Sequence, residues 1–202
     1  MAILPTIVAL ALGVGLGLWL GGSVERARSI RPDLARTAAV ALAVQILAQV
    51  IGLSGGWAVF VDLVSKGALI AFAVFNLRIG GMVVLAAGLS LNWLVTILNW
   101  GMPTSRAALE RAGLIDPGTT GTVHLTGARH VADGDRLSFL GEVIALPTHQ
   151  VISIGDVLTL VGVVLVIMAV LRARVLPAES SPLRLDQITL PRGPRGLSRR
   201  HA

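Results

Sequence analysis

Apolar residues in this chain gather in long runs, and most of the charged residues lie in the segments between them. A helix needs about 20 residues to cross the hydrocarbon core of a bilayer. Five runs reach or approach that length, at residues 3–22, 36–54, 58–77, 80–100 and 153–171. Since backbone groups inside lipid must be hydrogen-bonded within the chain, each run is predicted to be a helix.

The composition points the same way. Hydrophobic residues make up 54% of the 202 residues and charged residues only 14%, whereas a soluble domain carries about 25% charge. The chain has no cysteine, which excludes disulfide scaffolds, zinc–thiolate sites and thiol catalysis, and nothing in the sequence indicates a cofactor. We therefore predict an all-α, polytopic membrane bundle of five transmembrane helices.

Arginines set the expected orientation, because positively charged loops stay in the cytoplasm. They crowd the loop at 23–36, the turn at Arg78 and the segment 172–202. This pattern predicts an outside N-terminus, a cytoplasmic C-terminus, a bundle over 1–171 with one long extracytoplasmic loop at 101–152, and a flexible basic tail at 172–202. The net charge of +6 is thus explained by topology, and no nucleic-acid partner is expected.

Small residues recur every four positions in the first two predicted spans. They are Ala9, Gly13, Gly17 and Gly21 in the first, and Ala35, Ala39 and Ala43 in the second. Such ridges let two helix backbones approach closely. We expect both ridges to pack internally between neighbouring spans, with homodimerisation as the alternative.

Polar side chains inside the predicted spans gather toward the outer half of the membrane. They are Gln45, Gln49, Asp62, Ser65, Lys66, Asn92, Thr96, Asn99, Asp156 and Thr159. Asp62 and Lys66 are four residues apart, which allows an ion pair on one helix face. The cluster fits either plain hydrogen bonding between helices or an outward-open cavity for a lipid, a peptide or a proton.

Two alternative functions use the same residues. Residues 151–170, where Ser153-Ile154-Gly155-Asp156 opens the span, loosely resemble the last span of lipoprotein signal peptidases. Those enzymes pair an Asp there with a second Asp in an Asn-x-x-Asp-Arg motif on the preceding span, where this chain has only Asn92 and Asn99. A catalytic pair would therefore need Asp62 with Asp156. A small transporter using Asp62, Lys66 and Asp156 is the other alternative.

The outer loop offers further candidates. Thr104 or Ser105 can cap a short helix through Ala112, which we expect to lie along the membrane surface. The apolar run 137–144 is too short to span, so it is predicted to be interfacial or re-entrant. His124 and His130 are weak metal candidates, because histidine is a common zinc ligand but their spacing matches no helical metal motif.

Several motifs resemble a bacterial membrane-protein family of unknown function. They are Asn99-Trp100-Gly101-Met102-Pro103, then His130, then Leu137-Ser138-Phe139-Leu140-Gly141-Glu142-Val143-Ile144, then Ser153-Ile154-Gly155-Asp156-Val157-Leu158. The family runs roughly as an Asn-Gly-Gly-x-Met-Pro turn, a His, a Leu-Pro-Phe-Leu-Gly-Asp-Ile/Val-Ile stretch and a Ser-Ile-Gly-Asp helix start. This chain departs from it with Trp100 in the Asn-Gly stretch, Ser138 for Pro and Glu142 for Asp. The resemblance implies a multispan protein of a bacterial plasma membrane and supplies no activity.

Together these patterns favour a non-enzymatic role. We expect a multi-pass scaffold or subunit that engages membrane lipid or a membrane-protein partner through its outer loop and outer-half polar cluster. The candidate binding residues are Gln49, Asp62, Lys66, Asn92, Asn99 and Asp156.

Overall fold

Apolar helices dominate the computed structural model, which describes residues 3–119 and 121–173. The predicted tail lies outside the described residues except for Arg172 and Ala173. The long helices are α1 (Ile3–Trp19), α3 (Ala35–Val50), α4 (Gly56–Phe75), α5 (Met82–Asn99) and α7 (Ile154–Leu171).

Three of these helices, α4, α5 and α7, are long and apolar enough to cross a membrane. Helices α1 and α3 are also apolar but shorter, with 17 and 16 residues. The outer surface of the helices carries many exposed Leu, Val and Ile side chains. Such a surface is unfavourable in water and suits contact with lipid, so the chain is membrane-associated.

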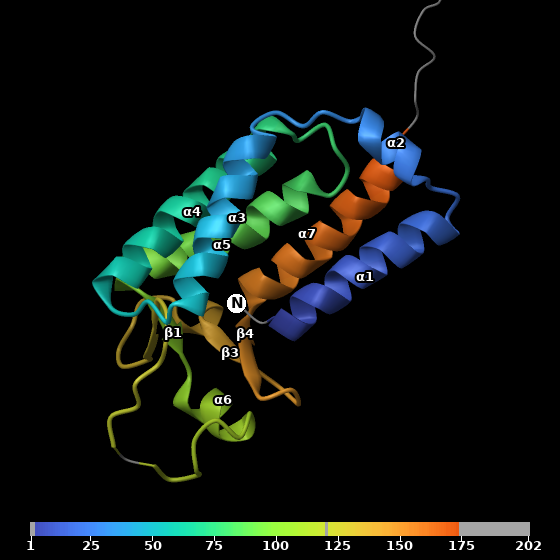
Figure 1. The fold of residues 1–202 in the computed structure, drawn as a ribbon. Coiled ribbons are helices and arrows are strands. Elements are labelled where there is room, and N and C mark those ends of the chain that lie inside the picture. The colour runs from blue at the N-terminus through green and yellow to red at the C-terminus, as the bar shows by residue number, and fades with distance from the viewer. Residues whose placement is uncertain (1–2, 120, 174–202) are drawn as a thin grey trace, which may run out of the picture.

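The helices pack in an order that differs from their order along the chain. Helix α5 lies between α4 and α7, while α3 packs on α4 and α1 packs on α7 (Figure 1). The resulting series is α3, α4, α5, α7, α1. The first helix of the chain therefore packs against the last one.

The small-residue ridge of the first run packs inside the molecule at Ala9, Gly13 and Gly17, as the sequence predicts, whereas Gly21 lies beyond α1 and is exposed. A Cβ added at Gly13 would lie 3.0 Å from the Cβ of Ile167, and one at Gly17 would meet Leu171 at 2.6 Å. Because residue numbers rise together along both helices, α1 and α7 run parallel.

The predicted small-residue ridge of α3 does not pack against another helix. Ala35, Ala39 and Ala43 are exposed, and Ala38 and Ala41 are buried instead. The prediction of internal packing is therefore wrong for this ridge. Its helix lies at the end of the series and packs chiefly on α4, so only one of its faces is covered.

The all-α prediction is also wrong in one part, because the outer loop contains a four-stranded sheet. Its strands are β1 (Met102–Thr104), β2 (Arg129–Val131), β3 (Glu142–Leu146) and β4 (Gln150–Ser153). Their order is β2-β1-β3-β4; β1 pairs in parallel with β2 and β3, and β3 pairs antiparallel with β4.

The run at 137–144 does not form a re-entrant helix. It forms a short 3₁₀ turn at Ser138–Leu140 and the start of β3. The β-branched pairs Val143-Ile144 and Val151-Ile152 flank a short turn, which is a hairpin pattern. The backbone N–H and C=O groups of β3 find their hydrogen-bond partners in the neighbouring strands of the sheet.

The short helix of the loop, α6 (Arg106–Arg111), does not have a free apolar face. Ala108 and Leu109 are fully buried and cluster with Val151 of β4. Its apolar side therefore covers the sheet, which corrects the prediction that this helix lies along the membrane surface.

The two ends of the bundle differ in character. At one end, α2 (Val24–Ser29) lies beside the last turn of α7, where the Ser23 amide donates to the Leu171 carbonyl. At the same end Arg78 pairs with Asp33 at 2.7 Å. The sheet and α6 lie at the opposite end (Figure 1), so the arginine-rich loops are separated from the sheet by the length of the bundle.

Candidate functional site

A cavity of about 390 Å³ lies where the sheet meets the helices. Four helices and the sheet region line it. Its ionisable and amide-bearing side chains are Gln45 and Gln49 of α3, Asp62 and Lys66 of α4, Asn92 of α5, Asp156 of α7, and Arg129, Glu142, His149 and Gln150 of the outer loop.

Asp156 is fixed by the first turn of α7. Its Oδ2 accepts from the Ser153 amide at 2.9 Å, and the Ser153 hydroxyl accepts from the Asp156 amide at 2.9 Å. This reciprocal capping box satisfies two backbone donors that the start of a helix otherwise leaves unpaired. The Ser-Ile-Gly-Asp sequence therefore dictates where the carboxylate lies.

Asn92 ties this capping box to the neighbouring helix. Its Nδ2 donates to Asp156 Oδ1 at 2.7 Å, and its Oδ1 accepts from the Ser153 hydroxyl at 2.8 Å. Asn92 is only 3% exposed. Both ends of its amide are thus used to hold α5 and α7 together at the cavity wall.

Glycines make this short reach possible. A Cβ on Gly88 would lie 2.5 Å from the Thr159 amide nitrogen and 2.7 Å from the Gly155 carbonyl oxygen, and a Cβ on Gly155 would overlap the Asn92 amide. The backbones of α5 and α7 are therefore in contact at this point, as small residues at membrane-helix crossings allow.

The opposite wall of the cavity carries an ion pair. Lys66 Nζ lies 2.6 Å from Asp62 Oδ2, and the two side chains are 12% and 21% exposed. At about 1.5 Å of rise per residue, Lys66 lies about 15 Å along α4 from the sheet end of the helix. The pair thus extends the polar lining well into the bundle.

The outer loop adds an acid, Glu142, which is absent from the binding residues predicted from the sequence. Glu142 is 9% exposed, accepts from the Thr104 hydroxyl at 2.8 Å and lies 3.5 Å from Arg129. Burial raises the pKa of Glu142; Arg129 and the Thr104 hydrogen bond oppose the rise, and the nearby charge of Asp156 adds to it. A negative charge on Glu142 is therefore disfavoured.

Hydrogen-bonding capacity is left over inside the cavity. Both side-chain polar atoms of Gln45 are buried and have no hydrogen-bond partner among the described residues. A buried amide without a partner costs about 1–3 kcal/mol. Such a group in a cavity wall is a natural contact point for a polar ligand or a water.

An apolar cluster closes the cavity toward the other end of the bundle. Leu89 lines the cavity and belongs to a buried cluster with Ala38, Ala41 and Leu69. The polar lining therefore ends inside the bundle and does not continue through it.

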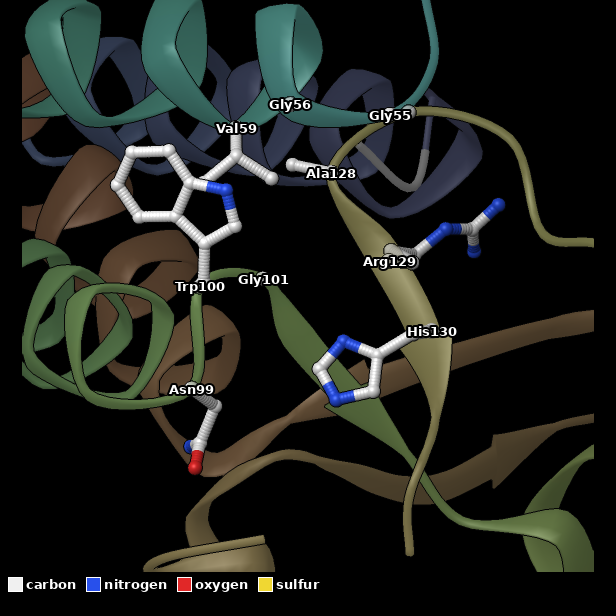
Figure 2. Close-up of a pocket in the computed structure, with 10 residues that line it drawn as sticks. Gly55, Gly56, Val59, Asn99, Trp100, Gly101, Ala128, Arg129 and His130 are labelled. Atoms are coloured by element: carbon white, nitrogen blue, oxygen red, sulfur yellow. The ribbon is translucent and has the colours of Figure 1, made fainter.

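A second pocket, of about 350 Å³, lies on the other side of the segment 127–129. Figure 2 shows the rings of Trp100 and His130 projecting into it from the end of α5 and from β2. His130 Nε2 lies 2.9 Å from Asp135 Oδ1. Trp100 has a φ of 49°, a left-handed conformation that favours glycine.

The structure brings five of the six predicted binding residues to the first cavity. The exception is Asn99, which lines the second pocket and binds the outer loop instead. Its Nδ2 donates to the Arg136 carbonyl at 2.8 Å, and its Oδ1 accepts from the Arg136 amide at 2.8 Å. Asn99 therefore anchors the loop to the end of α5.

The metal and catalytic candidates find little support in the geometry. Within residues 3–119 and 121–173, no three His, Asp or Glu side chains converge as metal ligands would, and His124 is exposed. Asp62 and Asp156 line one cavity, but each carboxylate is bound to a partner of its own. The described contacts therefore include no carboxyl pair sharing a proton between these two residues.

Sequence reasoning missed several lining residues of the outer loop. Arg129 and His149 lie in segments without a helical period, and Glu142 lies in the run that was assigned to the membrane interface. The signal that could have placed Glu142 is the hairpin pattern at 142–153, because it brings Glu142 opposite Ser153.

These features define a membrane-associated helical protein with a small sheet over a polar cavity. The chain belongs to a family of unknown function (DUF5317), whose model matches residues 33–168. That segment contains every residue of the cavity lining and all four strands, and it excludes α1. No curated protein and no solved structure matches the chain.

Proposed function

We propose that this is a multi-pass protein of a bacterial plasma membrane, with five spans, an outside N-terminus and a cytoplasmic C-terminus. Two observations support this arrangement. Helices α1 and α3 lie alongside α7 and α4, and the arginine-rich loops lie at the end of the bundle opposite the sheet (Figure 1). Basic loops mark the cytoplasmic side, so the sheet and the cavity face outward.

Within that arrangement the protein acts by binding and not by catalysis, and its ligand is the polar headgroup of an outer-leaflet lipid. The observation that carries this proposal is the cavity itself, where side chains of α3, α4, α5 and α7 meet beneath the sheet. The unpartnered Gln45 amide supports it. Binding of this kind suits a scaffold or subunit of a larger membrane assembly.

The geometry favours binding over the two alternatives. Hydrolysis by two carboxyls needs them to share a proton, whereas Asp62 is bound to Lys66 and Asp156 to Asn92 and Ser153. Transport needs a path to the other side of the membrane, and the cluster around Leu89 closes the cavity in that direction.

Lipid retention in native mass spectrometry tests the proposal. Ala48 lines the cavity, so Ala48→Phe should fill it and release a lipid that the wild-type protein keeps through detergent washing. Ala39→Phe is the matched control, because Ala39 is exposed on the same helix. The proposal fails if the wild-type protein retains no lipid, or if the two variants retain it equally while eluting as monodisperse species.

A further inference from the structure

Groups of both charges line the cavity. They are the carboxylates Asp62, Glu142 and Asp156 and the cations Lys66 and Arg129. Lys66 is paired with Asp62 and Arg129 lies 3.5 Å from Glu142, whereas the described donors to the Asp156 carboxylate are the Asn92 amide and the Ser153 backbone amide. A ligand cation beside Asp156 would therefore compensate a charge in a partly desolvated site, where an uncompensated charge is costly.

Unused hydrogen-bonding capacity of both kinds is present. Lys66 carries three N–H donors, and its one described hydrogen bond is to Asp62. An ionised carboxylate has about four acceptor sites, and Asp156 uses two of them. The amide of Gln45 offers a donor and an acceptor that lack partners among the described residues.

We propose, on the basis of the proposed headgroup site, that the cavity selects a small zwitterion carrying a primary ammonium and a phosphate, the chemistry of a phosphoethanolamine headgroup. The ammonium donates to the remaining acceptor sites of Asp156. The phosphate accepts from the remaining donors of Lys66 and from the Gln45 amide.

The preference for phosphoethanolamine over other lipid headgroups follows from the groups that those headgroups lack. A choline group has no N–H donor, so it cannot satisfy Asp156 by hydrogen bonding. A glycerol headgroup carries a net negative charge and leaves the phosphate without an internal cation. Because charge-assisted hydrogen bonds are strong, the ammonium donors are expected to dominate selectivity.

The two sources of this chemistry are a membrane lipid and a free soluble zwitterion. The test uses full-length protein in vesicles of equal parts phosphatidylethanolamine, phosphatidylcholine and phosphatidylglycerol. Native mass spectrometry then identifies the retained lipid. A second series replaces phosphatidylethanolamine by its N-monomethyl and N,N-dimethyl forms, which removes the donors one at a time. A third arm adds soluble glycerophosphoethanolamine as a competitor.

We expect phosphatidylethanolamine to be retained about tenfold over each of the other two lipids, the ratio expected for one charge-assisted hydrogen bond. Retention should fall stepwise with methylation. The double variant Asp62→Asn/Lys66→Met, which removes the ion pair without leaving either charge alone, should lower retention of every phospholipid. Its melting temperature reports whether it folds.

The outcomes separate the two proposals. Retention without headgroup preference, or without a methylation effect, overturns the zwitterion while leaving lipid binding intact. Retention by Ala48→Phe equal to that of the wild type overturns both. Displacement of the lipid by glycerophosphoethanolamine identifies the headgroup as sufficient. Binding of that soluble compound with no lipid retained supports the zwitterion and overturns the lipid as its source.

Discussion

A single amide, that of Asn92, uses both of its ends to join two helices. It donates to Asp156 and accepts from Ser153, so two other side chains depend on its position. Because these groups are at most partly exposed, loss of the amide leaves their polar atoms without compensation from water.

Asn92→Leu keeps the approximate size of the side chain and removes both hydrogen bonds. We expect it to lower the free energy of unfolding by about 2 kcal/mol, since buried polar partners left unpaired cost 1–3 kcal/mol. Denaturant titration in mixed micelles measures this. Ser90→Ala, at an exposed polar position of the same helix, should change stability by less than about 0.5 kcal/mol; equal effects would refute the assigned role.

Glu142 gives a pH-dependent prediction. Its pKa in the folded protein lies above the ordinary value of 4.5, so the unfolded chain releases this proton first as the pH rises. The contribution of Glu142 to the free energy of unfolding therefore falls between pH 4.5 and the raised pKa, and is constant above it.

Glu142→Gln removes this titration and keeps a polar group beside Thr104. The melting temperature of the variant should fall less between pH 4.5 and 8 than that of the wild type. Glu25→Gln, at an exposed site at the other end of the bundle, should retain the wild-type slope. A Glu142→Gln curve parallel to the wild-type curve would show that this carboxyl does not titrate abnormally.

At the scale of elements, the contact between α5 and α7 depends on glycine. Gly88→Ala places a methyl group 2.5 Å from the Thr159 amide, so the two helices must separate. We expect a loss of about 1–3 kcal/mol in the free energy of unfolding, together with reduced lipid retention because Asn92 moves away from Asp156.

Gly15→Ala is the matched control for this crossing. Gly15 lies within α1, and a Cβ there would meet nothing within 4 Å. Its substitution should leave the thermal stability and lipid retention of the protein unchanged. Similar losses in both variants would mean that glycine matters here for helix conformation and not for close packing.

The sequence predicted some elements well, for a physical reason. Long apolar runs determine helices strongly, because lipid leaves the backbone no other partner. The strands escaped notice because β1 and β2 have three residues each, and pairing between distant segments carries no local period. Ala35, Ala39 and Ala43 are spaced like a close-packing ridge but are exposed. Regular spacing of small residues therefore does not tell whether another helix packs on them.

At the scale of the whole molecule, orientation is testable with unusual simplicity because the chain contains no cysteine. Thr122→Cys places one thiol in the exposed outer loop, and Ser29→Cys places one at the opposite end. With a membrane-impermeant maleimide, intact cells should label the first variant only. Permeabilised cells should label both, and the reverse pattern in intact cells would invert the proposed topology.

The site was predictable in its helical part and not in its outer part. Gln49, Asp62, Asn92 and Asp156 could be assigned to one depth by counting residues from the helix ends. Asn99 could not, since at the end of α5 it meets Arg136 of the loop. The contributions of Arg129 and Glu142 depend on the sheet, whose pairing the sequence pattern did not reveal.

The packing of α1 against α7 has a consequence for how the protein is made. During synthesis the first helix emerges long before its packing partner, because α7 begins only at Ile154. At about 5–20 residues per second, that interval is on the order of ten seconds. Throughout it, the glycine face at Gly13 and Gly17 has no Ile167 or Leu171 to receive it. The nascent chain must therefore keep this apolar helix without its packing partner until translation of the bundle is nearly finished.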